Sequence, residues 1–341
     1  MAQHRIMSGM RATGQLHIGH YLGVLKNWIR LQHEYDCYFA VADWHMLTTG
    51  SDKTDPLRDN TRDIVLDWLA AGVDPNKATI YVQSAVLETA ELFLLLSMIT
   101  PVNWMQRDPT LKDMIRDLKM AEDTVGHGLL GYPALQTADI LGVMGDLVPV
   151  GRDQVAHIEI SRDIARRFNH LYGVDYFPEP RPLLTDTPVV VGVDGRKMSK
   201  SYGNDIKLAD GPEQVQSKIM ASVTDPARIK KTDFGHPEVC AVYAMWEMLG
   251  REKAPEVAEL CRKAEIGCVQ DKKALAAHIN EILAPMQERR RELATNPGML
   301  EDIIASGNAK ARATTRETVE RVREIMKLNR FSESGKPVFG A

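Results

Sequence analysis

A short stretch at residues 13–20 combines the residue types that hold phosphate groups. It reads Thr-Gly-Gln-Leu-His-Ile-Gly-His, and it lies between an apolar run and a helical pattern. Gly14 and Gly19 let the backbone approach a phosphate closely, while His17 and His20 add donors to the free N–H groups of a helix start. The stretch predicts a cradle for a triphosphate, although a tight strand–helix turn with two surface histidines would show the same pattern. It lacks the Lys-Ser/Thr ending of a P-loop, which excludes that class.

A second candidate is the lysine–serine loop at residues 197–201, Lys-Met-Ser-Lys-Ser, which follows Asp-Gly-Arg. Lys197 and Lys200 on a glycine-flanked loop can move toward a phosphate and stabilise charge on a leaving group. Such a loop alone is usually a solvated surface turn. Two segments of this chemistry, one in each half of the chain, are far more specific than either alone.

The first half of the chain alternates between strand and helix patterns. Short apolar runs predict strands at 6–8, 37–42, 79–83 and 147–150, and helical spacing of apolar residues predicts helices at 19–35, 55–72 and 153–170. This alternation implies parallel strands with crossover helices, that is, an α/β fold with a Rossmann-like, doubly wound sheet. Such sheets bind ligands at the carboxyl ends of their strands.

The second half of the chain has a different pattern. Residues 177–194 contain four prolines and predict a linker. Beyond residue 211 the chain is rich in helix formers, especially at 256–262, 272–291 and 310–327, without a clear strand between them. We therefore expect a catalytic domain at 1–195 and a mostly α-helical domain at 196–341 that begins with the lysine–serine loop, and its last helix is expected to pack back on the first domain.

The composition limits the class of protein. Among 341 residues, 42 are Lys or Arg and 46 are Asp or Glu, which gives a net charge of −4 and disfavours nonspecific coating of nucleic acid. The uncharged run at 92–106 is shorter than the ~18 apolar residues of a membrane span. No apolar leader follows the N-terminus, so we expect a cytoplasmic protein. Its four cysteines are then expected to be thiols or metal ligands rather than disulfides.

The two candidate segments carry a family resemblance. His17-Ile18-Gly19-His20 and the 197–201 loop resemble the two signatures of class I aminoacyl-tRNA synthetases. The resemblance implies activation of an amino acid by ATP with Mg²⁺, release of pyrophosphate, and transfer to the terminal ribose of tRNA. It assigns His17 and His20 to the phosphates in the transition state, and Lys197 and Lys200 to the departing pyrophosphate. Because the substrates supply the nucleophiles, such catalysis consists of positioning and electrostatics.

Within class I, residues 38–43, 132–140 and 148–154 resemble bacterial tryptophanyl-tRNA synthetases. The resemblance implies that Asp139 accepts the indole N–H, since a buried carboxylate needs a donor and indole has one. The other residues that it implies for the tryptophan pocket are Gln136, Gln154, Met7 and Trp44. The residues that it implies for ATP are Arg11, Ala12, Thr13, Gly19, His20, Gly151, Arg152, Asp153, Val190, Lys197, Met198, Ser199, Lys200 and Ser201.

Met7, Gln136 and Trp44 depart from the commonest bacterial pattern, and they resemble the subgroup that carries an iron–sulfur cluster. That subgroup has four cysteines in the helical domain. Here the positions hold Cys240, Cys261, Cys268 and Asp271, so a carboxylate replaces the fourth thiolate. A [4Fe–4S] cluster with Asp271 as a ligand, a zinc site, and free thiols all remain open.

The same resemblance implies a homodimer that binds tRNA(Trp), with the anticodon read in the helical domain. Basic clusters that could contact phosphates occur at Arg162, Arg166 and Arg167, at Arg289, Arg290 and Arg291, and after residue 300. Three alternatives stay open. The nearest is a tyrosyl-tRNA synthetase, another is an adenylylating enzyme of the same fold, and the third is a synthetase-like protein without activity.

Overall fold

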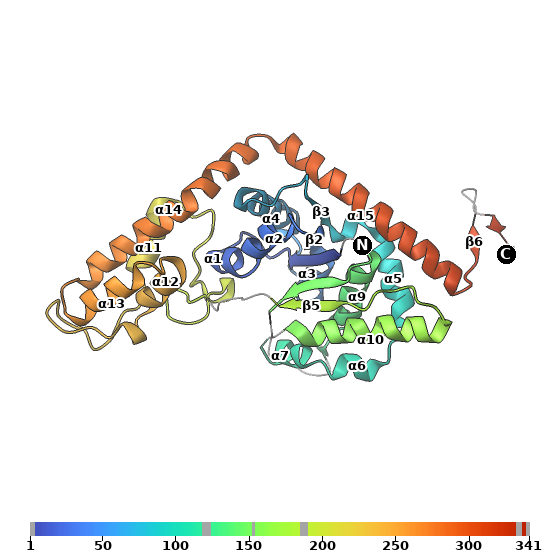
Figure 1. Cartoon of the computed structure of the whole chain (residues 1–341), viewed down its shortest axis with the longest axis horizontal. Coiled ribbons are helices and arrows are strands. Elements are labelled where there is room, and N and C mark those ends of the chain that lie inside the picture. Colours follow the sequence, from blue (N-terminus) through green and yellow to red (C-terminus); the bar gives the residue numbers. More distant parts are fainter. Residues whose placement is uncertain (1–3, 118–123, 152–153, 185–189, 332–335, 339–341) are drawn as a thin grey trace.

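A parallel sheet forms the centre of the first half of the chain (Figure 1). This computed structural model describes residues 4–117, 124–151, 154–184, 190–331 and 336–338. Strands β1 (Arg5–Arg11), β2 (Asp36–Ala42), β3 (Ala78–Val82), β4 (Leu147–Val150) and β5 (Arg181–Leu184) pair in parallel in the order β3-β2-β1-β4-β5. The order reverses between β1 and β4, which is where a doubly wound sheet binds its ligand. The predicted α/β fold is confirmed.

Two strands differ from the prediction. The first strand does not end near Gly9 but continues to Arg11, and a Cβ on Gly9 would lie only 2.9 Å from Ala40 O of β2, so glycine permits this close pairing. The expected linker at 177–194 contains β5, and that part of the prediction is wrong. β5 is the edge strand of the sheet, where Pro182 can lack a backbone N–H without breaking a central ladder.

Alternate residues of β2 face two separate cores because successive side chains of a strand point to opposite faces. Phe39 packs with α2 (Lys26–Leu31) and α4 (Leu57–Ala71), and its ring stacks on Trp28 with centroids 4.1 Å apart. Tyr38 faces α9 (Tyr132–Gly142) and α10 (Val155–Tyr172) on the other side. Helices therefore cover both faces of the sheet, as the sequence pattern predicts.

Shorter elements connect these layers. In the first half they are α1 (Ile18–His20), the π-helical segment η1 (Tyr21–Leu25), α3 (Asp43–Gly50), η2 (Gln83–Ala85), α5 (Leu87–Ser97), α6 (Val102–Gln106), α7 (Pro109–Asp117) and α8 (His127–Leu130). In the second half they are η5 (Lys200–Tyr202), α11 (Pro212–Met220), η6 (Pro237–Val239), α12 (Ala241–Leu249), α13 (Ala254–Arg262), and the two-residue strands β6 (Arg330–Phe331) and β7 (Pro337–Val338).

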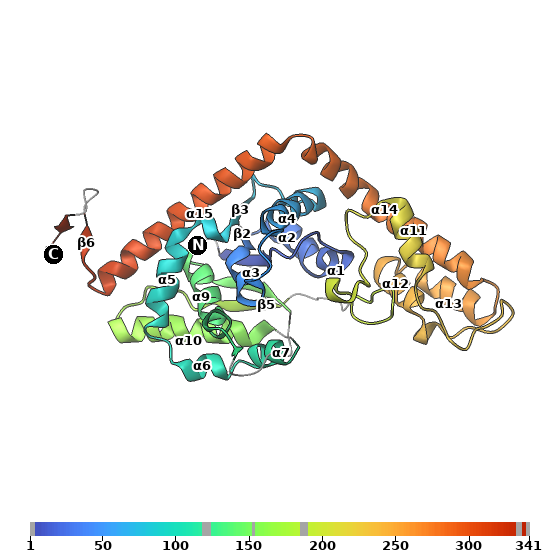
Figure 2. The same cartoon turned by 180° about the vertical axis from the view of Figure 1, so that it is seen from behind.

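Two long helices join the helical part of the chain to the sheet. α14 (Cys268–Ala294) and α15 (Pro297–Ile325) form an arch that is visible from both sides (Figures 1 and 2). α14 packs on α11 and α12 at one end and on α4 at the other, and α15 crosses β3 and α5. A Cβ on Gly307 would lie 1.8 Å from Ile80 O, so glycine lets α15 touch the edge strand. Within the described residues, none of the helices is long and apolar enough to cross a bilayer.

Candidate active site

The glycine–histidine turn lies at the carboxyl end of β1, as predicted. α1 begins right after His17, and His17 N donates to Nδ1 of His20 at 3.2 Å. The two imidazole rings lie with centroids 3.8 Å apart. A Cβ on Gly19 would come within 2.8 Å of the His17 ring and within 3.6 Å of Val190. Glycine at position 19 is therefore what allows the two histidines to gather beside Val190.

Burial removes the positive charge of both histidines. It lowers the pKa of His17 to about 4, an effect that Asp205 opposes and Lys200 reinforces. Burial also lowers the pKa of His20 to about 3, with further lowering from His17 and Lys200. At neutral pH both rings are uncharged hydrogen-bonding groups. His17 Nδ1 is buried without a hydrogen-bond partner in the described part of the chain, so this ring can still bond to a ligand.

The lysine–serine loop reaches the same turn through one of its two lysines. Lys200 Nζ donates to Gly14 O at 2.7 Å and to Thr13 O at 3.2 Å, although 186 residues or more separate them in sequence. Burial lowers the pKa of Lys200 to about 8, and Lys207 lowers it further, while Asp67 and Asp205 raise it. Lys197 is exposed, and its side chain makes no hydrogen bond or ion pair within the described residues. The structure thus brings Lys200, and not Lys197, to the cradle.

The rest of the loop is held by hydrogen bonds that its backbone N–H groups donate. Met198 is buried and its N–H donates to Val190 O at 2.7 Å. Ser199 Oγ accepts the N–H of Ser201 at 3.3 Å, which caps η5, and Asn204 Oδ1 accepts the N–H of Ser199 at 2.8 Å. These contacts fix the backbone on both sides of Lys200.

Arg11 ends β1 and points its guanidinium toward α3. Its Nη2 donates to Thr49 Oγ1, but its Nε is buried without a partner among the described residues. Burial lowers the pKa of Arg11, although its ordinary pKa is so high that the group stays charged. Ala12 is fully buried, and Thr13 is exposed beside it. Arg11 therefore offers an unused cationic donor next to the phosphate cradle.

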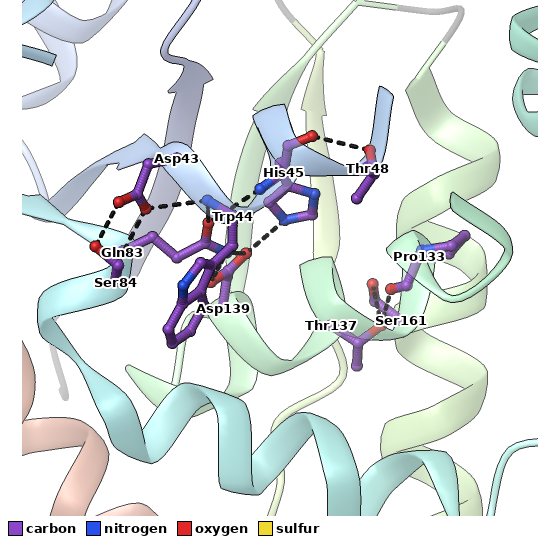
Figure 3. A network of polar contacts seen from close by, with 10 residues as sticks. All are labelled: Asp43, Trp44, His45, Thr48, Gln83, Ser84, Pro133, Thr137, Asp139 and Ser161. Carbon is purple, nitrogen blue, oxygen red and sulfur yellow. Dashed lines mark hydrogen bonds and ion pairs between the residues drawn. The ribbon is translucent and has the colours of Figure 1, made fainter. Parts of the chain in front are cut away.

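The second part of the site is a buried carboxylate on α9 (Figure 3). Asp139 is 4% exposed. Gln83 Nε2 donates to both of its oxygens, at 2.8 Å to Oδ1 and 2.9 Å to Oδ2, and His45 Nε2 lies 2.8 Å from Oδ2. Sequence reasoning missed Gln83 and His45. The usable signal is that Gln83 directly follows β3 and His45 comes three residues after the end of β2, at the edge where a doubly wound sheet binds ligands.

One helix connects the two parts of the site. α3 carries His45, which touches Asp139, and Thr49, which touches Arg11. The rings of His45 and Tyr132 are 6.4 Å apart, and Tyr132 also affects Arg11 electrostatically. The groups expected for the nucleotide and for the amino acid therefore share one edge of the sheet.

The other expected pocket residues are placed as follows. Gln136 lies one turn before Asp139 on α9, and its Oε1 is buried without a partner within the described chain. Met7 is buried beside Tyr81 and Ile140. Gly151 and Gln154 follow β4, and Gln154 N donates to Gly151 O at 3.1 Å. Trp44 is half-buried next to His45 on α3. Arg152 and Asp153 lie outside the described residues.

The helical part of the chain reaches the cradle through a buried ion pair. Asp67 of α4 accepts the N–H of Leu16 at 2.8 Å and the Nε of Arg290 at 2.7 Å. Arg290 also pairs with Asp63, and Arg289 donates to Ala70 O. Both arginines thus make contacts with α4, Arg290 half-buried in the ion pair and Arg289 from an exposed position.

Other basic clusters are also paired. Arg162 bonds to Glu159, Arg166 to Glu179, and Arg167 to Ile99 O. On α15 the paired arginines are Arg312 and Arg316 with Glu88, Arg321 with Glu324, and Arg323 with Glu91. These side chains mainly tie helices together or cover their surfaces.

The four residues of the candidate metal site, for which a cluster, zinc and free thiols were left open, do not gather as metal ligands in the described structure. Cys240, Cys261 and Cys268 are half-buried in one region, and burial raises the pKa of Cys240 and Cys261. Asp271 Oδ1 accepts the indole N–H of Trp246 at 2.7 Å, and Arg228 Nη1 lies 3.5 Å from Cys261 Sγ. Among the described residues, no three His, Cys, Asp or Glu side chains gather as metal ligands. Cys37 is a buried β2 residue, as expected.

A cavity of about 560 Å³ lies elsewhere, between residues 75–80 and the first half of α15. None of the expected site residues lines it. This cavity is therefore separate from the residues gathered at the carboxyl edge of the sheet.

Comparisons with known proteins show which family the chain resembles. Residues 2–284 match the family model of class I tRNA synthetases for tryptophan and tyrosine. A tryptophan–tRNA ligase from Thermotoga maritima is 47% identical over 327 residues, covering 95% of this chain and 99% of that protein. One from Aquifex aeolicus is 41% identical over 394 residues, covering 95% and 100%. The solved structure of a tryptophanyl-tRNA synthetase from Campylobacter jejuni, complexed with ADP and tryptophan, has a TM-score of 0.85 at 31% identity, covering 95% and 100%.

Proposed function

The chain belongs to the class I tRNA synthetases for tryptophan and tyrosine, and we propose that it joins tryptophan to tRNA(Trp) in the cytoplasm. It activates L-tryptophan with ATP to tryptophanyl-adenylate and pyrophosphate, and then transfers tryptophan to the terminal ribose of the tRNA. The observation that carries the proposal is the contact of Lys200 with Gly14, because it joins the two signature segments at one edge of the sheet.

On the nucleotide side, the cradle supplies hydrogen bonds and the half-buried cation of Lys200. In the proposed reaction the tryptophan carboxylate attacks the α-phosphate and pyrophosphate leaves. Lys200 now rests on two backbone oxygens, and the phosphates would replace these weaker acceptors. His17 and His20 are neutral donors, so they can bind phosphate oxygens without a change of protonation. Lys197 is expected to join only when the phosphates are bound, since it is exposed in the free protein.

The cradle is poor in oxygen ligands for a divalent cation. Its side chains are cations and neutral donors, apart from Asp205, whose Oδ2 is buried without a partner in the described residues. Carboxylate oxygen is a ligand that Mg²⁺ accepts, so Asp205 and the phosphates themselves would hold it. When bound, Mg²⁺ supplies positive charge that neutralises the phosphates.

On the amino-acid side, Asp139 would accept the indole N–H. A side chain such as phenylalanine would leave this buried carboxylate short of a donor, and a discrimination of ~10⁴-fold or more is reasonable for such a site. Gln136 and Gln154 would line the same pocket. The aspartate thus explains why tryptophan is selected over purely apolar amino acids.

Amino-acid-dependent ATP–pyrophosphate exchange tests the proposed function. We expect exchange with tryptophan and none with tyrosine, followed by charging of tRNA(Trp). Exchange with tyrosine alone would instead support a tyrosyl-tRNA synthetase. Failure with every amino acid would favour an adenylylating enzyme of another kind or an inactive relative.

We propose that a second copy of the chain binds on α5. Leu87, Leu94 and Met98 are each more than half exposed, and their spacing puts them on one face of α5 and the turn that follows it. Contiguous exposed apolar surface is typical of protein interfaces. We expect a dimer by light scattering and a monomer for Leu94→Asp.

The proposed reaction requires no metal at Cys240, Cys261, Cys268 and Asp271. Since Asp271 bonds to Trp246, we expect little iron to bind when the protein is treated without oxygen with iron and sulfide. Asp271→Cys completes four thiolates and should bind more iron, whereas Asp271→Ser should not. Iron, sulfide and zinc per chain are measured. About four irons in the natural chain would make Asp271 a cluster ligand.

A further inference from the structure

Asp139 does not stand alone in its pocket. Its carboxylate on α9 receives hydrogen bonds from Gln83 of η2 and His45 of α3, so three elements meet at one charged group (Figure 3). Gln83 is fully buried, and 13% of the His45 side chain is exposed. Neither residue has a part in the reaction as described above.

The hydrogen bonds divide the two carboxylate oxygens unequally. A carboxylate has about four acceptor positions, two on each oxygen. Oδ2 takes both Gln83 and His45, whereas Oδ1 takes only Gln83 among the residues that the structure describes. One acceptor position therefore remains, on Oδ1. A ligand with a single N–H donor would fill that position.

The orientation of the Gln83 side-chain amide is fixed by the bonds that its oxygen accepts. Gln83 Oε1 accepts the backbone N–H of Trp44 at 3.1 Å and that of His45 at 3.4 Å. A flipped amide would turn its NH₂ group toward these two N–H donors, so the NH₂ group has to face Asp139. Asp43 accepts the N–H of Ser84 at 3.0 Å, which holds the strand end that carries Gln83.

We propose that Gln83, with His45, is a positioning residue that fixes Asp139 so that only Oδ1 reads the substrate N–H. This inference rests on the proposed function, because it names how the tryptophan pocket achieves its selectivity. Gln83 acts through Asp139 and does not touch the indole. Without it the carboxylate can rotate, and its free acceptor position is no longer aimed at one donor.

The test compares tryptophan with β-(3-benzothienyl)alanine, in which sulfur replaces the indole N–H. The measured quantity is the ratio of kcat/KM for the two compounds in ATP–pyrophosphate exchange. We expect Gln83→Met to lower this ratio by ~10-fold or more, mainly through the KM of tryptophan, and to change kcat/KM for the sulfur compound by less than ~3-fold. A general loss of structure would lower both values together.

Gln32→Met is the matched control. Gln32 is also a buried glutamine that bridges two backbone groups, Gly72 O and Asp74 N, away from Asp139. This variant should keep the natural ratio. If Gln83→Met does not fold, His45→Phe removes the third bond at a less buried position and should lower the ratio several-fold.

The outcomes separate the two proposals. A natural chain that activates tryptophan and rejects the sulfur compound, together with an unchanged ratio in Gln83→Met and His45→Phe, would overturn the positioning role alone. A natural chain that does not activate tryptophan would overturn the proposed function.

Discussion

The two parts of the proposed active site are prepared for their ligands in opposite ways. On the phosphate side, Arg11 Nε and His17 Nδ1 are buried without partners in the described structure, and burial weakens the charged state of His17, His20 and Lys200. On the indole side, Asp139 already has three hydrogen bonds. On the phosphate side the ligand has to supply the missing hydrogen-bond partners, whereas on the indole side all but one acceptor position of Asp139 is already filled.

This difference corresponds to the two tasks of the enzyme. Phosphate groups change charge and position during the reaction, so donors that become paired only with ligand can act most strongly in the transition state. The amino acid must be recognised before any chemistry, which needs a rigid acceptor. We therefore expect changes on the phosphate side to lower the rate and changes on the indole side to lower selectivity.

The largest effect is expected for Lys200→Ala. It removes the half-buried cation that touches the cradle, so kcat for exchange should fall by ~10²-fold or more while the dissociation constant for tryptophan stays the same. Equilibrium dialysis with labelled tryptophan measures the second quantity. Lys197→Ala, at the exposed lysine of the same loop, should cost less. A natural rate in Lys200→Ala would remove Lys200 from the mechanism.

A smaller effect, on selectivity, is expected for Asp139→Asn. Gln83 Nε2 contacts both carboxylate oxygens, so the NH₂ group of asparagine faces this donor in either orientation. It also faces either His45 or the indole N–H, and two donors then oppose each other. We expect kcat/KM for tryptophan to fall by ~10- to 10²-fold, with a smaller change for the benzothienyl compound. Thr137→Val is the control, because Thr137 lies on the same helix but bonds to Ser161 (Figure 3). Equal losses for both compounds would mean that another group reads the indole.

The sequence predicts the parts of this site that depend on local pattern. The turn at His17 and the loop at Lys200 are marked by glycines and lysines, and parallel strands bring both to one edge. β5 was missed because Pro182 suggests a linker, whereas an edge strand tolerates it. Gln83 and His45 were missed because each is a single polar residue shortly after a strand, and only the tertiary fold points them at Asp139.

The cysteine region shows that a sequence motif can be present without the contacts that it predicts. The spacing of Cys240, Cys261 and Cys268 fits a metal motif, but spacing does not say which bond Asp271 makes. Its acceptance of the Trp246 indole N–H depends on how α12 packs on α14. A motif with one substituted ligand can therefore keep its pattern while its side chains take other partners.

The smallest expected effect is a change in how kcat/KM for ATP depends on pH, which concerns the phosphate side alone. Burial lowers the pKa of Lys200 from 10.5 to about 8, so the free enzyme loses this charge as pH rises through 8. Because kcat/KM reports the free enzyme, kcat/KM for ATP should fall about fivefold between pH 8 and pH 9. In Lys200→Arg the side chain stays charged over this pH range, since arginine remains protonated in proteins. The fall in kcat/KM should therefore vanish. The value of kcat/KM below pH 8 should also be lower than in the natural chain, because arginine has a different geometry. Asp139 lies in the other part of the site, so Asp139→Asn should retain the fall. The same fall in Lys200→Arg would assign it to another group and would show that burial of Lys200 does not set the pH range of the phosphate side.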